Sequence, residues 1–265
     1  MSDHVVYSVT DPVAVVRLNR PDRLNALNAD VLNALREAIR QAEDDPAVVG
    51  IVITGTGRGF CSGWDADALA TEVGANSPYQ RVNEQDPTPD WFSFLLGTAK
   101  PVIAAINGAA AATGFVLALM ADLRFAAPTA RLTTAFSRRG LVAEHGSSWL
   151  LPRLIGPSKA LDLLFTSRMV DAEEALRIGL VDRVADDPVE EASAYIRALA
   201  ESCSPSSLRE AKRLVYRHLG DHDLAVREAW NAMTDSFERP DPTEGMSSFV
   251  ERRAPRFPRI GDDEI

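Results

Sequence analysis

Two glycine-rich turns, each at the end of an apolar strand, constrain the fold of this chain more than any other feature. The first turn covers residues 55–65 and follows the apolar run 48–54, and the second covers 107–114 and follows 101–106. Glycine leaves the backbone N–H groups at such strand ends uncrowded. Two N–H groups aimed at one carbonyl oxygen form an oxyanion hole, which stabilises the anion formed from a thioester. The pair of turns therefore indicates acyl-group chemistry.

Size and charge exclude several classes of protein. The chain has 265 residues, of which 46% are hydrophobic and 25% charged, so a packed core is expected. A formal net charge of −10 argues against general affinity for nucleic acid. Its cysteines, Cys61 and Cys203, belong to no metal-binding spacing. No signal peptide is visible, and polar residues and glycines interrupt the longest apolar stretch, 102–120. We therefore expect a cytoplasmic protein that binds neither nucleic acid nor a membrane.

The order of predicted strands and helices indicates an α/β body followed by a helical region. A hairpin over 5–19 precedes a helix that Asn28 caps and that runs to about Glu43. The apolar runs 48–54 and 101–106 are typical of strands buried on both faces, and 113–120 of an internal helix. Between them, 71–89 is expected to be a mobile or partly helical loop. Further short strands are expected at 123–126 and 131–134, and further helices at 147–154, 158–165 and 172–178.

The boundary of the α/β body is placed at residue 187. The core is thus 1–187, and 188–265 is expected to be entirely helical. One of its helices, 207–219, is amphipathic. We expect its apolar side chains to face inward and its basic side chains outward. The inward set is Leu208, Ala211, Leu214 and Val215, and the outward set is Arg209, Lys212, Arg213 and Arg217.

Segments spread over nearly the whole chain match one family in order and spacing. They are 18–27, 54–65, 100–108, 121–122, 139–156, 172–184 and 244–253. Together they resemble the enoyl-CoA hydratase/isomerase family, the crotonase superfamily. The resemblance implies a spiral of repeated strand-strand-helix turns, a homotrimer or dimer of trimers, and an acyl-CoA thioester substrate. Residues 188–265 would then serve oligomerisation. Coenzyme A would be part of the substrate, and no metal or redox cofactor is implied.

By position, the resemblance assigns the two oxyanion donors to the backbone N–H groups of Trp64 and Thr113. Both side chains are larger than the usual occupants, but a backbone donor survives that change. We expect the Trp64 indole to lie along the acyl pocket or near the pantetheine arm, with an ordinary packing tryptophan as the alternative. For Thr113 the alternative is a simple helix N-cap.

The acids expected of a family hydratase are absent from their positions. Hydratases of this family use two glutamates, and the matching positions hold Val116 and Phe136, neither of which transfers a proton. We expect Val116 to pack in the core and Phe136 to line the acyl pocket. Glu144 stands instead in the loop where some isomerases of the superfamily place their one catalytic carboxylate. The alternative for Glu144 is a solvated loop residue. His145 either orients Glu144, carries a second proton, or faces solvent.

One acid suffices for moving a double bond, since it removes a proton from one carbon and returns it to another. Double-bond isomerisation of an enoyl-CoA is therefore the activity that the sequence favours. Hydration of a trans-2-enoyl-CoA in fatty-acid oxidation, with a non-standard acid/base set, is the first alternative. A non-catalytic acyl-CoA-binding relative is the second.

Positions matching the family also predict coenzyme A contacts. Arg23 resembles the residue near the ribose and phosphates, and Phe249 and Arg252 resemble residues that reach the adenine and phosphates. The carbonyl group of Cys61 is expected to meet the adenine amine, and Asp65 to cap a helix. The remaining expected contacts lie in the first loop and the first glycine turn: Ala26, Gly63, Ala66 and Asp67.

Overall fold

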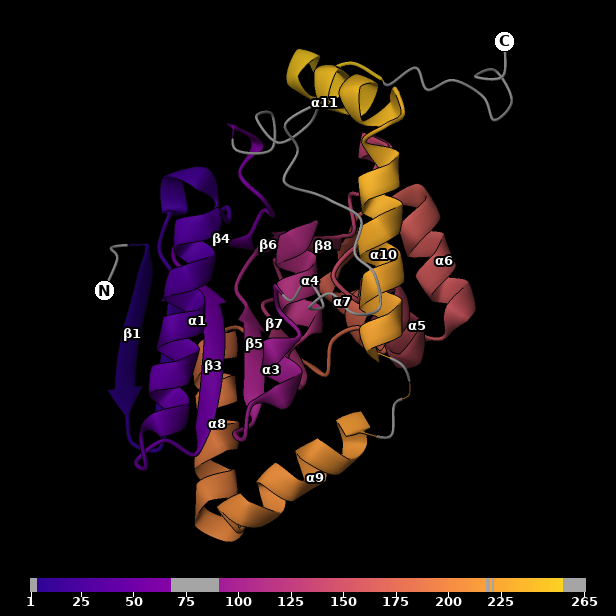
Figure 1. Cartoon of the computed structure of the whole chain (residues 1–265). Coiled ribbons are helices and arrows are strands. Elements are labelled where there is room, and N and C mark those ends of the chain that lie inside the picture. The colour runs from indigo at the N-terminus through magenta and orange to yellow at the C-terminus, as the bar shows by residue number, and fades with distance from the viewer. Residues whose placement is uncertain (1–3, 68–90, 218–219, 221, 255–265) are drawn as a thin grey trace.

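The computed structural model describes residues 4–67, 91–217, 220 and 222–254. The loop predicted over 71–89 lies outside these ranges. Within them the chain is a mixed α/β fold with two sheets, covered by helices (Figure 1). None of the helices in the described ranges combines the length and the apolar character that crossing a membrane requires.

The larger sheet has six strands in the order β1-β2-β3-β5-β7-β10 and carries the predicted hairpin at its edge. β1 and β2 are antiparallel, and the other pairs are parallel. All residues of β3 and β5 are buried, as expected of parallel strands covered on both faces. The strands span Val5–Thr10 (β1), Val13–Leu18 (β2), Gly50–Gly55 (β3), Val102–Ile106 (β5), Leu123–Ala126 (β7) and Arg183–Val184 (β10).

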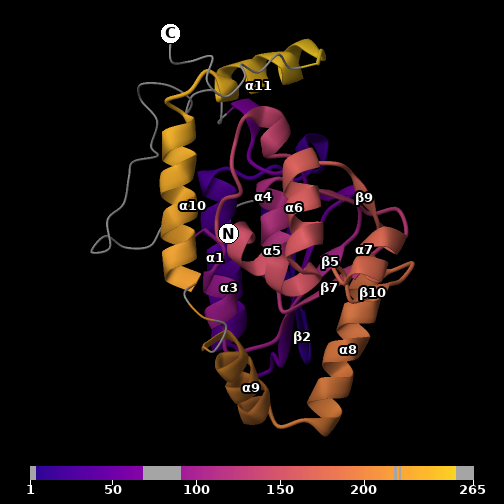
Figure 2. The ribbon, with the colours of Figure 1, turned by 90° about the vertical axis from the view of Figure 1, so that its right-hand side faces the viewer.

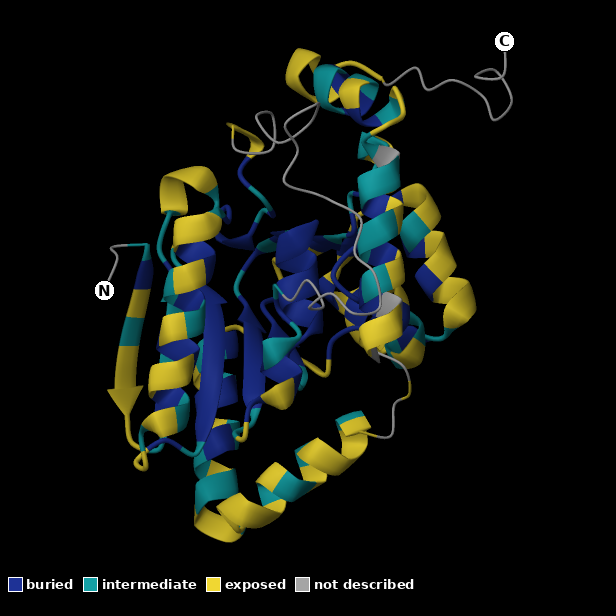
Figure 3. Cartoon of the chain, in the orientation of Figure 1, coloured by how far each residue is buried: buried dark blue, intermediate teal, exposed yellow. Residues whose placement is uncertain are grey.

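Helices cover both faces of this sheet. Helix α1 (Ala29–Asp44) begins as predicted at Asn28, whose side chain accepts a hydrogen bond at the first turn, and its outer face is exposed (Figure 3). Helix α8 (Pro188–Ser202) packs on the opposite face. Because successive side chains of a strand point to opposite faces, Ile53 packs in the core on the α1 side and Val52 on the α8 side. The predicted helical region therefore begins as part of the core.

The smaller sheet brings the two glycine turns together. Its order is β4-β6-β8-β9, and helix α4 (Thr113–Leu119) starts just after β6 and is buried throughout. A Cβ on Gly114 would lie 2.2 Å from the carbonyl oxygen of Cys61, so only glycine lets α4 approach β4 this closely. The start of α4 is thereby fixed beside the first turn. The strands span Gly59–Cys61 (β4), Ala109–Ala111 (β6), Arg131–Thr133 (β8) and Val170–Asp171 (β9).

Shorter helices surround α4. Helices α5 and α6 pack against each other beside α4 (Figure 2). The three helices predicted between 147 and 178 are confirmed, with ends shifted by no more than one residue. The elements are η1 (Pro21–Arg23), α3 (Phe94–Gly97), η2 (Ser137–Arg139), α5 (Ser147–Ile155), α6 (Pro157–Thr166) and α7 (Ala172–Ile178).

Helices α9 (Pro205–Arg217), α10 (His222–Ser236) and α11 (Asp241–Glu251) complete the described chain. Helix α10 contacts α5, and α11 contacts η2. Helix α11 lies at the end of the molecule away from α9 (Figure 1). The C-terminal helices thus reach the α/β body in several separate places.

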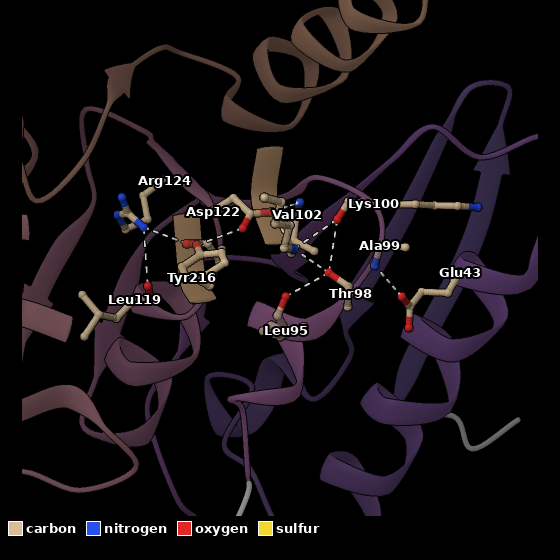
Figure 4. Close-up of polar contacts among 12 residues, drawn as sticks. Glu43, Leu95, Thr98, Ala99, Lys100, Val102, Leu119, Asp122, Arg124 and Tyr216 are labelled. Carbon is tan, nitrogen blue, oxygen red and sulfur yellow. Dashed lines mark hydrogen bonds and ion pairs between the residues drawn. The ribbon is translucent and has the colours of Figure 1, made fainter. Parts of the chain in front are cut away.

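The predicted inward face of α9 is wrong, because Leu214 and Val215 are exposed. Lys212, expected to point outward, instead turns its side chain toward the body of the protein, with its Nζ 2.8 Å from a carboxylate oxygen of Asp122. The hydroxyl of Tyr216 donates to the other Asp122 oxygen at 2.9 Å (Figure 4). A half-buried carboxylate is stabilised by polar partners, and α9 supplies two of them for Asp122. The helix is therefore docked by polar contacts rather than by an apolar stripe.

Candidate active site

The first predicted donor lies where the first glycine turn meets the loop before α1. The N–H of Leu27 donates to the carbonyl of Gly63 at 2.8 Å, and the N–H of Asp65 donates to the carbonyl of Leu27 at 2.7 Å. Successive N–H groups of an extended chain point in opposite directions. The N–H of Trp64 therefore points away from Leu27.

The second predicted donor stands at the start of α4. Thr113 is the first residue of this helix, where backbone N–H groups have no partner within the helix. The preceding Ala112 has φ 48°, in the left-handed region, and turns the chain out of β6. A Cβ on Gly63 would lie 3.5 Å from the backbone nitrogen of Thr113. Gly63, the residue before Trp64, therefore lies next to the backbone N–H of Thr113.

Trp64 and Thr113 line one small pocket together. Its volume is about 20 Å³, enough for roughly one water molecule. The pocket is lined by both predicted donors. It is also lined by the predicted acid, Glu144, and by Phe136, which was expected to line the acyl pocket. The lining residues are Trp64, Ala112, Thr113, Phe136, Arg139, Leu141, Glu144 and Met233.

Glu144 enters this pocket from the loop between η2 and α5. Its carbonyl accepts hydrogen bonds from the backbone N–H of Ser147 at 3.0 Å and from the Ser147 hydroxyl at 2.7 Å, which tie the loop to the start of α5. Glu144 is only 5% exposed, so the alternative of a solvated loop glutamate is wrong. Among the described residues that line the pocket, Glu144 provides the one carboxylate.

His145 lies behind Glu144 and away from solvent, so the solvent-facing alternative is also wrong. Its ring stacks on Trp91 with centroids 4.3 Å apart, and the edges of Phe92 and Trp230 pack around it. Burial lowers the pKa of His145 to about 3, so the imidazole is neutral at neutral pH. Its Nε2 lies 3.6 Å from a carboxylate oxygen of Glu144. His145 does not line the pocket and therefore stands behind the acid, not beside the substrate.

The two positions that hold glutamates in the family hydratases are apolar here and buried. Val116 is fully buried within α4, as predicted, and does not line the pocket. Phe136 is 1% exposed and forms part of the pocket wall. No second acid therefore faces Glu144 from either position.

A groove of about 260 Å³ adjoins the pocket at Trp64 and Arg139. The predicted coenzyme A contacts that line it are Arg23, Ala26, Asp65, Ala66 and Phe249. Arg23 forms an exposed ion pair with Asp67 at 2.9 Å. Asp65 pairs with Arg20 at 2.8 Å and, as predicted for a cap, accepts from the N–H of Asp67 at 3.1 Å.

Four predicted contacts do not line the groove, and one of them is Asp67, which forms the exposed ion pair with Arg23. Cys61 is fully buried, its carbonyl oxygen lies against Gly114, and burial raises the pKa of its thiol to about 12. Gly63 lies between the two donors instead. Arg252 ends α11 on the exposed surface.

The sequence did not single out four residues of the pocket wall: Ala112, Arg139, Leu141 and Met233. Met233 comes from α10, and no local pattern relates that helix to the glycine turns. For Arg139, the pair of arginines directly before the Gly140 turn was the available signal.

The two sheets and the helices around this pocket match solved structures of the crotonase fold. A family model for enoyl-CoA hydratase/isomerase matches residues 9–259, so the chain belongs to this family and to the crotonase superfamily. The family acts on acyl-CoA thioesters.

Individual relatives carry different activities in their names. The chain is 37% identical over 254 residues to a probable enoyl-CoA hydratase, echA8, of Mycobacterium tuberculosis, covering 92% of this chain and 94% of that one. It is 30% identical to a 1,2-epoxyphenylacetyl-CoA isomerase of Escherichia coli, with 97% and 99% covered. The crystal structure of a carnitinyl-CoA hydratase from Mycobacterium avium matches with a TM-score of 0.85 at 30% identity, covering 97% of this chain and 99% of that one.

Proposed function

We propose that this protein isomerises the double bond of an enoyl-CoA thioester, with Glu144 as the single acid and base. The observation that carries the proposal is the pocket wall, in which one buried carboxylate stands among apolar side chains and beside both predicted oxyanion donors. A reaction that needs one proton carrier and no water fits this arrangement.

The steps balance without a co-reactant. The Glu144 carboxylate takes a proton from C2 of a 3-enoyl-CoA, and the electron pair moves into the thioester to form a dienolate. The N–H groups of Trp64 and Thr113 donate to the enolate oxygen, which carries the negative charge. Glu144 then returns its proton to C4, which leaves a 2-enoyl-CoA.

Hydration is the second candidate, because named relatives are probable hydratases. It needs a base for water and an acid for the α-carbon. His145 is poorly suited to be the acid for the α-carbon, because its ring is buried behind Glu144 and burial lowers its pKa. A neutral imidazole outside the pocket does not protonate a substrate carbon.

One experiment separates these activities. Purified protein is given 3-hexenoyl-CoA and, separately, trans-2-hexenoyl-CoA, and the products are identified by chromatography and mass spectrometry. Isomerisation converts the first substrate to the second with no change in mass. A product heavier by one water from trans-2-hexenoyl-CoA contradicts the proposal in favour of hydration. Binding of both thioesters without conversion of either supports a non-catalytic acyl-CoA-binding protein.

A further inference from the structure

Arg139 joins the active-site pocket to the groove beside it. It ends η2, five residues before Glu144, and its side chain lines both the pocket and the groove. Its backbone is held in place, because α11 packs directly on η2. A Cβ on Gly245 would lie 2.4 Å from the carbonyl oxygen of Arg139, and one on Gly140 would lie 2.4 Å from the backbone of Asp241. The backbone that carries the Arg139 side chain is therefore held in one position by α11.

The charge of Arg139 has no carboxylate partner among the described residues. Its guanidinium lies over the ring of Phe249, 4.7 Å from the centroid, and makes no ion pair or side-chain hydrogen bond within those ranges. Asp65 pairs with Arg20, and Glu244 of α11 pairs with Arg253. Glu144 lines the same pocket, but Arg139 forms no ion pair with it. Burial lowers the pKa of Arg139, with no opposing contribution from a neighbouring acid.

Arg124 is a buried arginine with a structural role, and its contacts provide a comparison for Arg139. The buried guanidinium of Arg124 is 3.2 Å from Asp182 and donates to the carbonyls of Leu180 and Ala121 at 2.9 and 2.8 Å. A cation withdrawn from water is unfavourable unless such partners compensate it. Arg124 is fully buried and has such partners, whereas Arg139 is half-buried and has none among the described residues, so its anionic partner is expected in the ligand.

We propose that Arg139 binds a carboxylate on the acyl chain, so that the substrate is the coenzyme A thioester of a dicarboxylic acid. The inference rests on the proposed function for the placement of the thioester beside Trp64 and Thr113. Arg139 shares the pocket wall with Thr113 and Glu144. It also lines the adjoining groove of predicted coenzyme A contacts, so a coenzyme A phosphate is the competing anion that the binding test has to distinguish. A carboxylate accepts from guanidinium in a bidentate geometry, which fixes the chain as well as its charge.

Binding of unreactive thioesters tests this site without relying on catalysis. Adipoyl-CoA and hexanoyl-CoA have the same chain length and differ by the terminal carboxylate. Calorimetry is expected to show adipoyl-CoA binding tighter to the wild type, and Arg139→Gln losing about 10- to 100-fold of that affinity while hexanoyl-CoA binding changes less than threefold. Arg138→Gln is the matched control, because the neighbouring Arg138 is exposed and donates to the carbonyl of Thr166 at 2.9 Å.

Three results would overturn the inference. The first is equal affinity of the wild type for the two thioesters, and the second is an equal loss for both in Arg139→Gln. The third is a matching loss for free coenzyme A, which would identify the anion as a phosphate. Thermal melting of Arg139→Gln verifies that the variant is folded, and Arg139→Lys, which keeps the charge, is expected to recover part of the preference. Failure to isomerise both 3-hexenoyl-CoA and the 3-enoyl-CoA of the same length with a terminal carboxylate would count against the proposed function and leave these binding results standing.

Discussion

Gly63→Ala tests whether the two glycine turns form the oxyanion hole. Gly63 has φ 104°, a conformation that side chains rarely adopt, and its added Cβ would lie 3.0 Å from both the carbonyl oxygen of Ala111 and the Cβ of Ala112. The backbone between the donors must therefore shift by a few tenths of an ångström. We expect a loss of about 1–3 kcal/mol in the free energy of unfolding from backbone strain. The loss of one aligned donor lowers kcat by about 10²- to 10³-fold.

Gly156→Ala is the matched control for strain alone. Gly156 also has a positive φ, 80°, but an added Cβ there meets no atom within 4 Å. Chemical denaturation is expected to show comparable destabilisation of both variants, and steady-state kinetics with 3-hexenoyl-CoA to show the large loss of kcat only for Gly63→Ala. A Gly63→Ala enzyme that is folded and within threefold of wild-type kcat would refute the oxyanion-hole reasoning.

Three further predictions concern the pocket wall at Met233, the ion pair of Lys212 with Asp122, and the buried ring of His145. Met233→Ala opens the 20 Å³ pocket, so kcat/KM for a longer acyl chain relative to a short one is expected to rise at least about tenfold; an unchanged ratio means that Met233 does not limit the chain. Lys212→Met leaves Asp122 without its cation and is expected to cost roughly 3 kcal/mol in urea unfolding, against less than about 0.5 kcal/mol for the exposed Lys159→Met. His145 takes up a proton in the unfolded chain below its ordinary pKa but stays neutral in the folded one down to about pH 3, so stability falls by up to about 1.4 kcal/mol per unit as pH decreases from about 6.5. Replacement by Asn removes that slope, and an identical pH dependence would contradict the assignment.

The sequence predicted those elements of the fold whose signals are local. Asn28 caps α1, uninterrupted apolar runs give β3 and β5, and the all-apolar run after Thr113 gives the buried helix α4. Each of these rests on a residue's own neighbours along the chain. The short strands of the smaller sheet were less visible, since a strand of three residues carries too little pattern.

Sequence reasoning failed where a residue's environment is set by distant parts of the chain. The amphipathic pattern of α9 predicted an apolar contact, but Asp122, about ninety positions earlier, draws in Lys212 and Tyr216 instead. Met233 and Arg139 enter the pocket wall because α10 and η2 meet α4 in space. Glu144 was selected because its position in the chain resembles that of a catalytic carboxylate in the family. In the structure it is buried and lines the same pocket as Trp64 and Thr113.

The central claim, that Glu144 alone moves the proton, is tested most directly by exchange at the substrate carbon. Wild type and Glu144→Gln are incubated with 3-hexenoyl-CoA in deuterated water, and loss of the C2 proton is followed by NMR while affinity is measured by calorimetry. The account predicts that Glu144→Gln lowers the rates of exchange and isomerisation together, by about 10²- to 10⁴-fold, with less than a threefold change in affinity. Exchange at the wild-type rate in Glu144→Gln would contradict it.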